Sequence, residues 1–150
     1  MARLFIFIAL LALTPHATGF FWDWFRPSHP TEIVNSGSTN ACDYTITIKG
    51  HNAHYVVCGN RTGTAKLSDS VKNQIAQAVK AAEPLDKLPT RPCPKSASFG
   101  TTTVVKHKGK ATGDISCAST DQVNKLFNAT ETVVQQLHLN LVKHIITLPL

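Results

Sequence analysis

Three histidines fall near the tips of two predicted β-hairpins, where an imidazole is accessible to a ligand. His51 and His54 lie at the tip and on the return of the first hairpin, and His107 lies at the tip of the second. An imidazole can ligate a metal, act as acid and base, or change its charge on mild acidification. If the hairpins lie side by side, the three rings share one sheet edge and form a ribonuclease-like acid–base site. The alternative is that they are ordinary solvated turn residues.

The densest positive cluster in the chain surrounds the third of these histidines, in the run KHKGK at residues 106–110. Lysines beside histidines indicate a site for a phosphate or a sulfated sugar, and they could also stabilise charge that develops in a reaction. Basic turns also occur simply because they are solvated and discourage edge-to-edge pairing. The predicted site for an anion or a partner consists of His51, His54, Lys106, His107, Lys108 and Lys110.

No stretch carries a catalytic motif that names a reaction. The chain has neither a G-x-S-x-G elbow nor a G-x-x-x-x-G-K-[ST] phosphate loop. A zinc site needs three or four ligands, and the four cysteines are better explained as disulfides. We therefore assign no catalytic residue, and we expect neither a cofactor nor a metal.

The stretch from Cys42 to Cys58 predicts a hairpin bracketed by cysteines. Its first half alternates, with Tyr44, Ile46 and Ile48 on one face, which is typical of a half-buried strand. Turn residues follow at 50–52, and residues 55–57 supply the return strand.

The predicted fold of this hairpin brings its two cysteines to the same end of the ladder. Four cysteines allow three connectivities. We favour Cys42–Cys58 with Cys93–Cys117, and the rival is Cys58–Cys93 with Cys42–Cys117.

Two amphipathic helices are predicted, one after each hairpin. A polar loop is expected at residues 60–66, and then Ser68 or Ser70 caps a helix over residues 69–83 that Pro84 ends. A second hairpin, with strands at 101–106 and 110–117, precedes a long helix capped by Ser119 or Thr120. The apolar face of this helix is Val123, Leu126, Phe127, Val134, Leu137 and Leu141.

The resulting order is β-β-α-β-β-α. It predicts a small two-layer α+β domain in which an antiparallel sheet of two hairpins carries both helices on one face, stapled by disulfides. The two halves match in element order and cysteine placement, so they form a pseudo-repeat.

The first 19 residues have the pattern of a secretory signal peptide. A basic start is followed by the apolar run LFIFIALLAL and by small residues before Phe20. The alternative is an uncleaved anchor. Export agrees with paired cysteines and with two glycosylation sequons, at Asn60 and Asn128.

Residues 20–25 hold an aromatic cluster, and residues 26–41 are predicted to form a flexible linker, so that a single α+β domain begins near Cys42 and spans residues 42–150. The cluster is expected to contact a membrane or a partner, unless it folds back on its own domain. Its aromatic residues are Phe20, Phe21, Trp22, Trp24 and Phe25.

Composition suits one globular domain, with 43% hydrophobic and 16% charged residues. Without Arg3, 14 basic and 9 acidic residues remain, a net charge of +5. We predict a secreted, monomeric, non-enzymatic interaction protein, effector-, toxin- or inhibitor-like, with a protein or anionic surface as target; nucleic acid is not an expected partner. The alternatives are a small secreted hydrolase using the hairpin-tip histidines, and a membrane-surface-active protein using its aromatic N-terminus.

Overall fold

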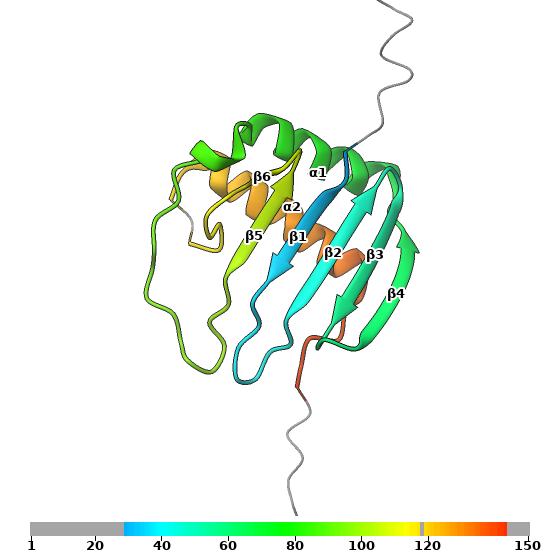
Figure 1. Cartoon of the computed structure of the whole chain (residues 1–150), viewed down its shortest axis with the longest axis vertical. Coiled ribbons are helices and arrows are strands. Elements are labelled where there is room, and N and C mark those ends of the chain that lie inside the picture. Colours follow the sequence, from blue (N-terminus) through cyan, green and yellow to red (C-terminus); the bar gives the residue numbers. More distant parts are fainter. Residues whose placement is uncertain (1–28, 118, 144–150) are drawn as a thin grey trace, which may run out of the picture.

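A six-stranded antiparallel sheet carries two helices on one face (Figure 1). The computed structural model describes residues 29–117 and 119–143. The strand order across the sheet is β4-β3-β2-β1-β5-β6. In chain order the elements are β1 (Thr31–Asn35), β2 (Tyr44–Lys49), β3 (Asn52–Val57), β4 (Arg61–Lys66), α1 (Asp69–Ala82), a short 3₁₀ helix (Leu85–Lys87), β5 (Thr103–His107), β6 (Lys110–Ala111) and α2 (Asp121–Gln136).

The hairpin predicted between Cys42 and Cys58 is confirmed as β2 and β3. Tyr44 pairs with Val57, and Lys49 pairs with Asn52 across a two-residue turn. The alternation expected for β2 is also present, because its three large apolar side chains are buried and the residues between them are not.

β1 is one of the two central strands of the sheet, and the flexible linker expected over residues 26–41 is therefore wrong at Thr31–Asn35. β1 pairs with β2 on one side and with β5 on the other. Ile33 has no exposed surface, and the Asn35 amide donates to the hydroxyls of Thr101 and Thr103. The five residues of β1 lie within a polar stretch of sequence. They form a strand because β2 and β5 supply backbone partners on its two sides and the helices cover one face. The domain thus begins before Cys42.

Two other expectations about strands are corrected. Residues 60–66 do not form a loop, because Arg61–Lys66 is a strand that pairs with β3 along its whole length. The return strand expected over residues 110–117 is reduced to Lys110–Ala111. The two hairpins thus gain β1 and β4, and the element order departs from a strict β-β-α repeat.

A polar cluster replaces strand pairing after β6. The carboxylate of Asp114 accepts hydrogen bonds from the backbone N–H groups of Thr103 (3.0 Å) and Ser116 (3.1 Å) and from the Ser116 hydroxyl (2.8 Å). Its second oxygen is paired with the ammonium of Lys95, which also donates to the Ser116 hydroxyl and the Thr101 carbonyl. This cluster fixes an irregular segment that has few ladder hydrogen bonds of its own.

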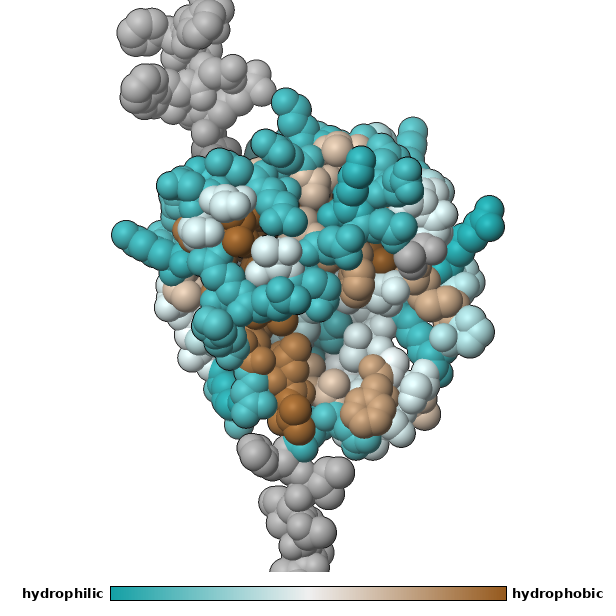
Figure 2. Space-filling view, turned by 180° about the vertical axis from the view of Figure 1, so that it is seen from behind, coloured by the Kyte–Doolittle hydropathy of each residue, from teal (hydrophilic) through white to brown (hydrophobic). Residues whose placement is uncertain are grey.

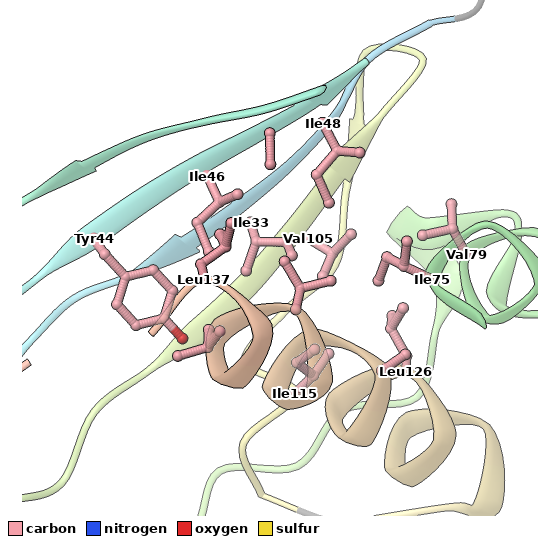
Figure 3. Packing of buried hydrophobic residues seen from close by; sticks show 14 of the residues in the cluster. Ile33, Tyr44, Ile46, Ile48, Ile75, Val79, Val105, Ile115, Leu126 and Leu137 are labelled. Atoms are coloured by element: carbon pink, nitrogen blue, oxygen red, sulfur yellow. The ribbon is translucent and has the colours of Figure 1, made fainter. Parts of the chain in front are cut away.

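Both helices begin where the sequence places them. Ser68 caps α1 by accepting from the N–H of Val71, and Thr120 caps α2 by accepting from the N–H of Val123. Their apolar faces pack against the sheet (Figure 3). The buried core between the layers includes Ile33, Tyr44, Ile46, Ile75, Val79, Val105, Ile115, Leu126 and Val133.

The favoured disulfides, Cys42–Cys58 and Cys93–Cys117, are both present. The expected class, a small two-layer α+β domain with an antiparallel sheet and two disulfides, is confirmed. The signal peptide predicted at residues 1–19, the aromatic residues 20–25 and the apolar tail at 144–150 lie outside the described residues.

Candidate functional site

The two hairpin tips lie at the same end of the sheet, but they are not neighbours. Thr31 at the start of β1 pairs with Ile48 of β2 on one side and with His107 of β5 on the other. β1 therefore separates the hairpins that a shared histidine site would require to be adjacent. Figure 1 shows both tips at the upper end of the sheet, with β1 between them.

His51 lies in the β2–β3 turn beside the start of α1. Its Nδ1 atom is 3.3 Å from the carbonyl oxygen of Leu67, and its Nε2 atom is 3.3 Å from the Lys72 ammonium and 3.6 Å from an Asp69 carboxylate oxygen. The ring therefore links the turn to the first turn of the helix.

His107 lies at the end of β5, on the side of the sheet that carries the helices. Its Nδ1 atom is 3.1 Å from the Thr31 hydroxyl and 3.2 Å from the Pro30 carbonyl oxygen, and its side chain is 16% exposed. The Nε2 atom is 3.9 Å from a carboxylate oxygen of Glu83, the residue that ends α1. The ring joins β1, β5 and the helix end.

The three histidines do not converge. His51 and His107 contact opposite ends of α1, whose 14 residues span about 20 Å at 1.5 Å per residue. His54 lies on the other face of the sheet, because the alternation of β3 buries its neighbour Ala53 and leaves His54 exposed. Two catalytic imidazoles must reach one substrate at hydrogen-bond distance. The geometry of a shared acid–base site is absent.

The three lysines of the basic cluster each have an acidic partner. Lys106 pairs with Glu32 at 2.8 Å and Lys108 with Glu83 at 3.0 Å. In the third pair, Lys110 lies 2.7 Å from an oxygen of Asp86.

These contacts also affect the acids. The hydrogen bond from Lys108 lowers the pKa of the Glu83 carboxyl, and the one from Lys110 lowers the pKa of Asp86. The cluster is locally neutralised, so an incoming anion would meet a carboxylate beside each ammonium group.

A shallow pocket of about 340 Å³ lies beside His107. It brings together several of the predicted anion-binding residues with the end of α1. Its lining consists of Glu83, Pro84, Leu85, His107, Lys108 and Lys110. Because its lysines are paired with acids, the pocket presents mixed charge rather than a positive field.

A larger groove of about 920 Å³ lies between α1 and α2. Figure 2 shows this side of the molecule, and hydrophilic residues dominate its upper part. Its lining is mostly amide and small side chains, including Asn73, Gln77 and Asn128. Part of its hydrogen bonding is internal, since Gln122 donates to the Ala81 carbonyl at 2.9 Å.

The two sequons lie in different settings. Asn60 is exposed in the turn between β3 and β4, and Thr62 of the same sequon is exposed as well. Asn128 is exposed on α2, but Thr130 of its sequon is completely buried, with its hydroxyl bonded to the Phe127 carbonyl. Only the first sequon presents both of its polar side chains to solvent.

The surface that the sequence did not reveal is the face of the sheet opposite the helices. In Figure 1 the strands lie in front and both helices behind, so no described element covers this face. We call it the open face. The alternation of β1 to β5 directs onto it the side chains of Glu32, Val34, Thr45, Thr47, Lys49, Asn52, His54, Val56, Thr62, Thr64, Lys66, Val104 and Lys106.

Threonine gives the open face its character. Thr47 of β2 and Thr64 of β4 lie on either side of His54 of β3. One row further along, Thr45 and Thr62 lie on either side of Val56. The T-x-T spacing within each strand was the available signal. It was missed because residues 61–66 contain no large apolar residue that would predict a strand.

The described part of the chain holds neither a cluster of metal ligands nor a helix that could cross a membrane. Residues 29–117 and 119–143 contain no group of three or more histidine, cysteine or acidic side chains placed to hold a metal ion. No helix in these ranges is both long enough and apolar enough to cross a bilayer.

Comparisons with known proteins add no assignment: no family model, curated protein or solved structure matches the chain.

Proposed function

We propose that this chain is a secreted, non-enzymatic binding module that engages an acidic partner protein through its open face. The single observation that carries the proposal is the open face itself, five full strands wide and uncovered by any described element. Two disulfides support an oxidising, extracellular setting, because such bridges persist there.

The charge of the open face favours an acidic partner. Of its basic side chains, Lys106 is paired with Glu32. Lys49 and Lys66 lie in the same row at the hairpin-tip end, flanking Asn52, and neither has an acidic side chain within 4 Å among the described residues. Two ammonium groups without an acidic partner among the described residues, on a hydroxyl-rich surface, attract carboxylates and steer their approach.

The geometry of the hairpin tips weakens the hydrolase alternative. The distance between His51 and His107 along α1, and the position of His54 on the other face, leave no shared acid–base pair. The membrane-active alternative depends on residues 20–25, which lie outside the described residues, and it stays a prediction.

The experiment places a photoreactive amino acid at Thr47, on the open face, or at Gln77, in the groove between the helices. Each protein is illuminated in its native secretion medium. We expect a covalent adduct with another polypeptide from position 47 and none from position 77. A double charge reversal, Lys49→Glu with Lys66→Glu, should reduce the position-47 adduct at least tenfold.

Position and charge must both matter for the proposal to stand. Equal adduct formation from both faces, or a position-47 adduct that survives the charge reversal, would contradict it. Circular dichroism of each variant establishes that a lost adduct reflects the surface and not unfolding.

A further inference from the structure

β4 is an edge strand of the sheet that the described residues form. It pairs with β3 through six consecutive residue pairs, and among the described residues no strand pairs with its other side. An edge of this kind exposes a row of backbone donors and acceptors that can template another strand.

The phase of the pairing identifies which groups face outward. The N–H of Leu67 donates to the carbonyl of His51, so the hydrogen-bonded pairs of the β3–β4 ladder fall on every second residue from there: Ala53–Ala65, Tyr55–Gly63 and Val57–Arg61. The backbone groups of the alternate residues, Thr62, Thr64 and Lys66, therefore point away from β3.

One of these outward groups already has a partner. The Lys66 carbonyl lies 3.4 Å from the Gln136 amide nitrogen. Both backbone groups of Thr62 and of Thr64, together with the Lys66 N–H, remain available in the described structure. That is a continuous set of donors and acceptors for one extended segment.

β4 lacks the features by which edge strands usually discourage pairing. It contains no proline, its register runs without a bulge, and its four central residues are small and uncharged. A Cβ added at Gly63 would clash with the Tyr55 hydroxyl, so the Tyr55 ring packs over the glycine and leaves no protruding side chain there. The opposite edge differs, because β6 has only two residues and one is a lysine.

The charges at β4 select the occupant. Arg61 and Lys66 stand at its two ends, Lys49 lies nearby on the open face, and neither β3 nor β4 contains an acidic residue. A second copy of this strand would bring two basic ends together, whereas a segment with acidic ends would be attracted.

We infer that β4 accepts an extended, acid-flanked segment of the partner protein as a seventh strand of the sheet. Main-chain hydrogen bonds to Thr62 and Thr64 align the segment. Its acidic ends are attracted by Lys66 and by the charge of the Arg61 guanidinium, which also donates to the Asn140 carbonyl at 2.7 Å. The inference rests on the proposed binding function and names the partner's recognised element.

The test uses a synthetic hexapeptide probe with glutamate at both ends and alternating valine and threonine between them. Backbone amide spectra of the full secreted chain are recorded during titration with the probe. We expect the largest shifts at Thr62, Thr64 and Lys66. A probe with lysine at both ends should bind at least tenfold more weakly.

The decisive variant is Thr64→Pro, which removes one outward N–H and no hydrogen bond of the β3–β4 ladder, since proline is tolerated where an edge N–H faces solvent. It should weaken probe binding at least tenfold. Its matched control, Thr64→Ala, removes the side chain but keeps the N–H and should bind within threefold of the wild type. Unchanged shifts elsewhere in each variant's spectrum establish that the fold is intact.

Three results would overturn the inference. They are the absence of shifts at β4 at millimolar probe, equal binding by Thr64→Pro, and β4 shifts that follow protein concentration without probe, which would make a second copy the occupant. If the probe fails but the position-47 adduct forms, the inference falls and the proposed function stands. If the probe binds but the adduct fails, the proposed function falls.

Discussion

Asp114 offers the sharpest test of how the irregular segment that follows β6 is held in place. Its carboxylate accepts from two backbone N–H groups and one hydroxyl and is paired with the Lys95 ammonium, while its side chain is only 23% exposed. Asp114→Asn keeps one carbonyl acceptor but turns an amide NH₂ or a neutral oxygen toward Lys95. Asp114→Ala removes every acceptor.

The magnitude follows from those contacts. A hydrogen bond to a charged group contributes roughly 1.5–3 kcal/mol, and a donor left without a partner costs about 1–3 kcal/mol. Water can reach part of the site and replace some of the loss. We expect Asp114→Ala to lower the free energy of unfolding by about 3 kcal/mol and Asp114→Asn by about half of that.

The stabilisation that Asp114 provides also depends on pH. Burial alone would raise the pKa of the Asp114 carboxyl, but the hydrogen bonds from Lys95, Thr103 and Ser116 outweigh it and hold the pKa below its usual value. The unfolded carboxyl therefore takes up a proton at a higher pH than the folded one. Its stabilisation is complete above the ordinary aspartate pKa and is lost as the pH falls through the folded value.

The assay is urea unfolding of the non-reduced protein, at about pH 7 and again at about pH 2. The gap between the wild type and Asp114→Asn should be largest at neutral pH and should shrink on acidification. Asp43→Asn is the control, because Asp43 is exposed and has no ion pair among the described residues. An Asp114→Asn protein as stable as the wild type, or a gap that does not change with pH, would refute this account.

Two further predictions concern the sheet and α2. Ile33→Ala should cost about 2–5 kcal/mol in unfolding free energy, because Ile33 is fully buried in β1. Val34→Ala on the open face should cost clearly less, and equal losses would contradict the assignment of the two faces. Burial raises the pKa of Glu131, so the folded state disfavours its charged form and loses stability as the pH rises from the ordinary glutamate pKa to the folded value. Glu131→Gln should therefore raise the urea midpoint at neutral pH, with the two proteins converging near pH 4, and an unchanged or lower midpoint at neutral pH would argue against a buried, destabilising charge.

Local patterns predicted the elements that carry large apolar residues. β2 alternates visibly, and both helices have an apolar face with a serine or threonine cap, so their positions depend on neighbouring residues alone. Even the disulfide pairing followed from a local turn, because the β2–β3 hairpin brings Cys42 and Cys58 together.

The strands that were missed are defined by distant partners. β1 has five residues and only two large apolar side chains, and its position inside the sheet depends on β5, far along the chain. β4 has only small and charged side chains and becomes a strand because β3 supplies its backbone partners.

The expected convergence of the three histidines was wrong for the same reason. The distance between His51 and His107 depends on the insertion of β1 between the hairpins and on where α1 crosses the end of the sheet. The acidic partners of Lys108 and Lys110 come from the end of α1 and the 3₁₀ helix, about 25 residues earlier. No spacing rule within residues 106–110 reveals them.

The central position of β1 has a consequence for biosynthesis. Thr31 and His107, which face each other in the sheet, are 76 residues apart in the chain. At 5–20 residues per second, roughly 4–15 s of synthesis separate the two. Throughout that interval the β5-facing edge of β1 has no native neighbour, and Ile33 lacks part of its cover. Among the described strands, the first to be made is therefore the one that waits longest for its second partner. This interval is when a nascent chain of this protein most needs protection from mispairing.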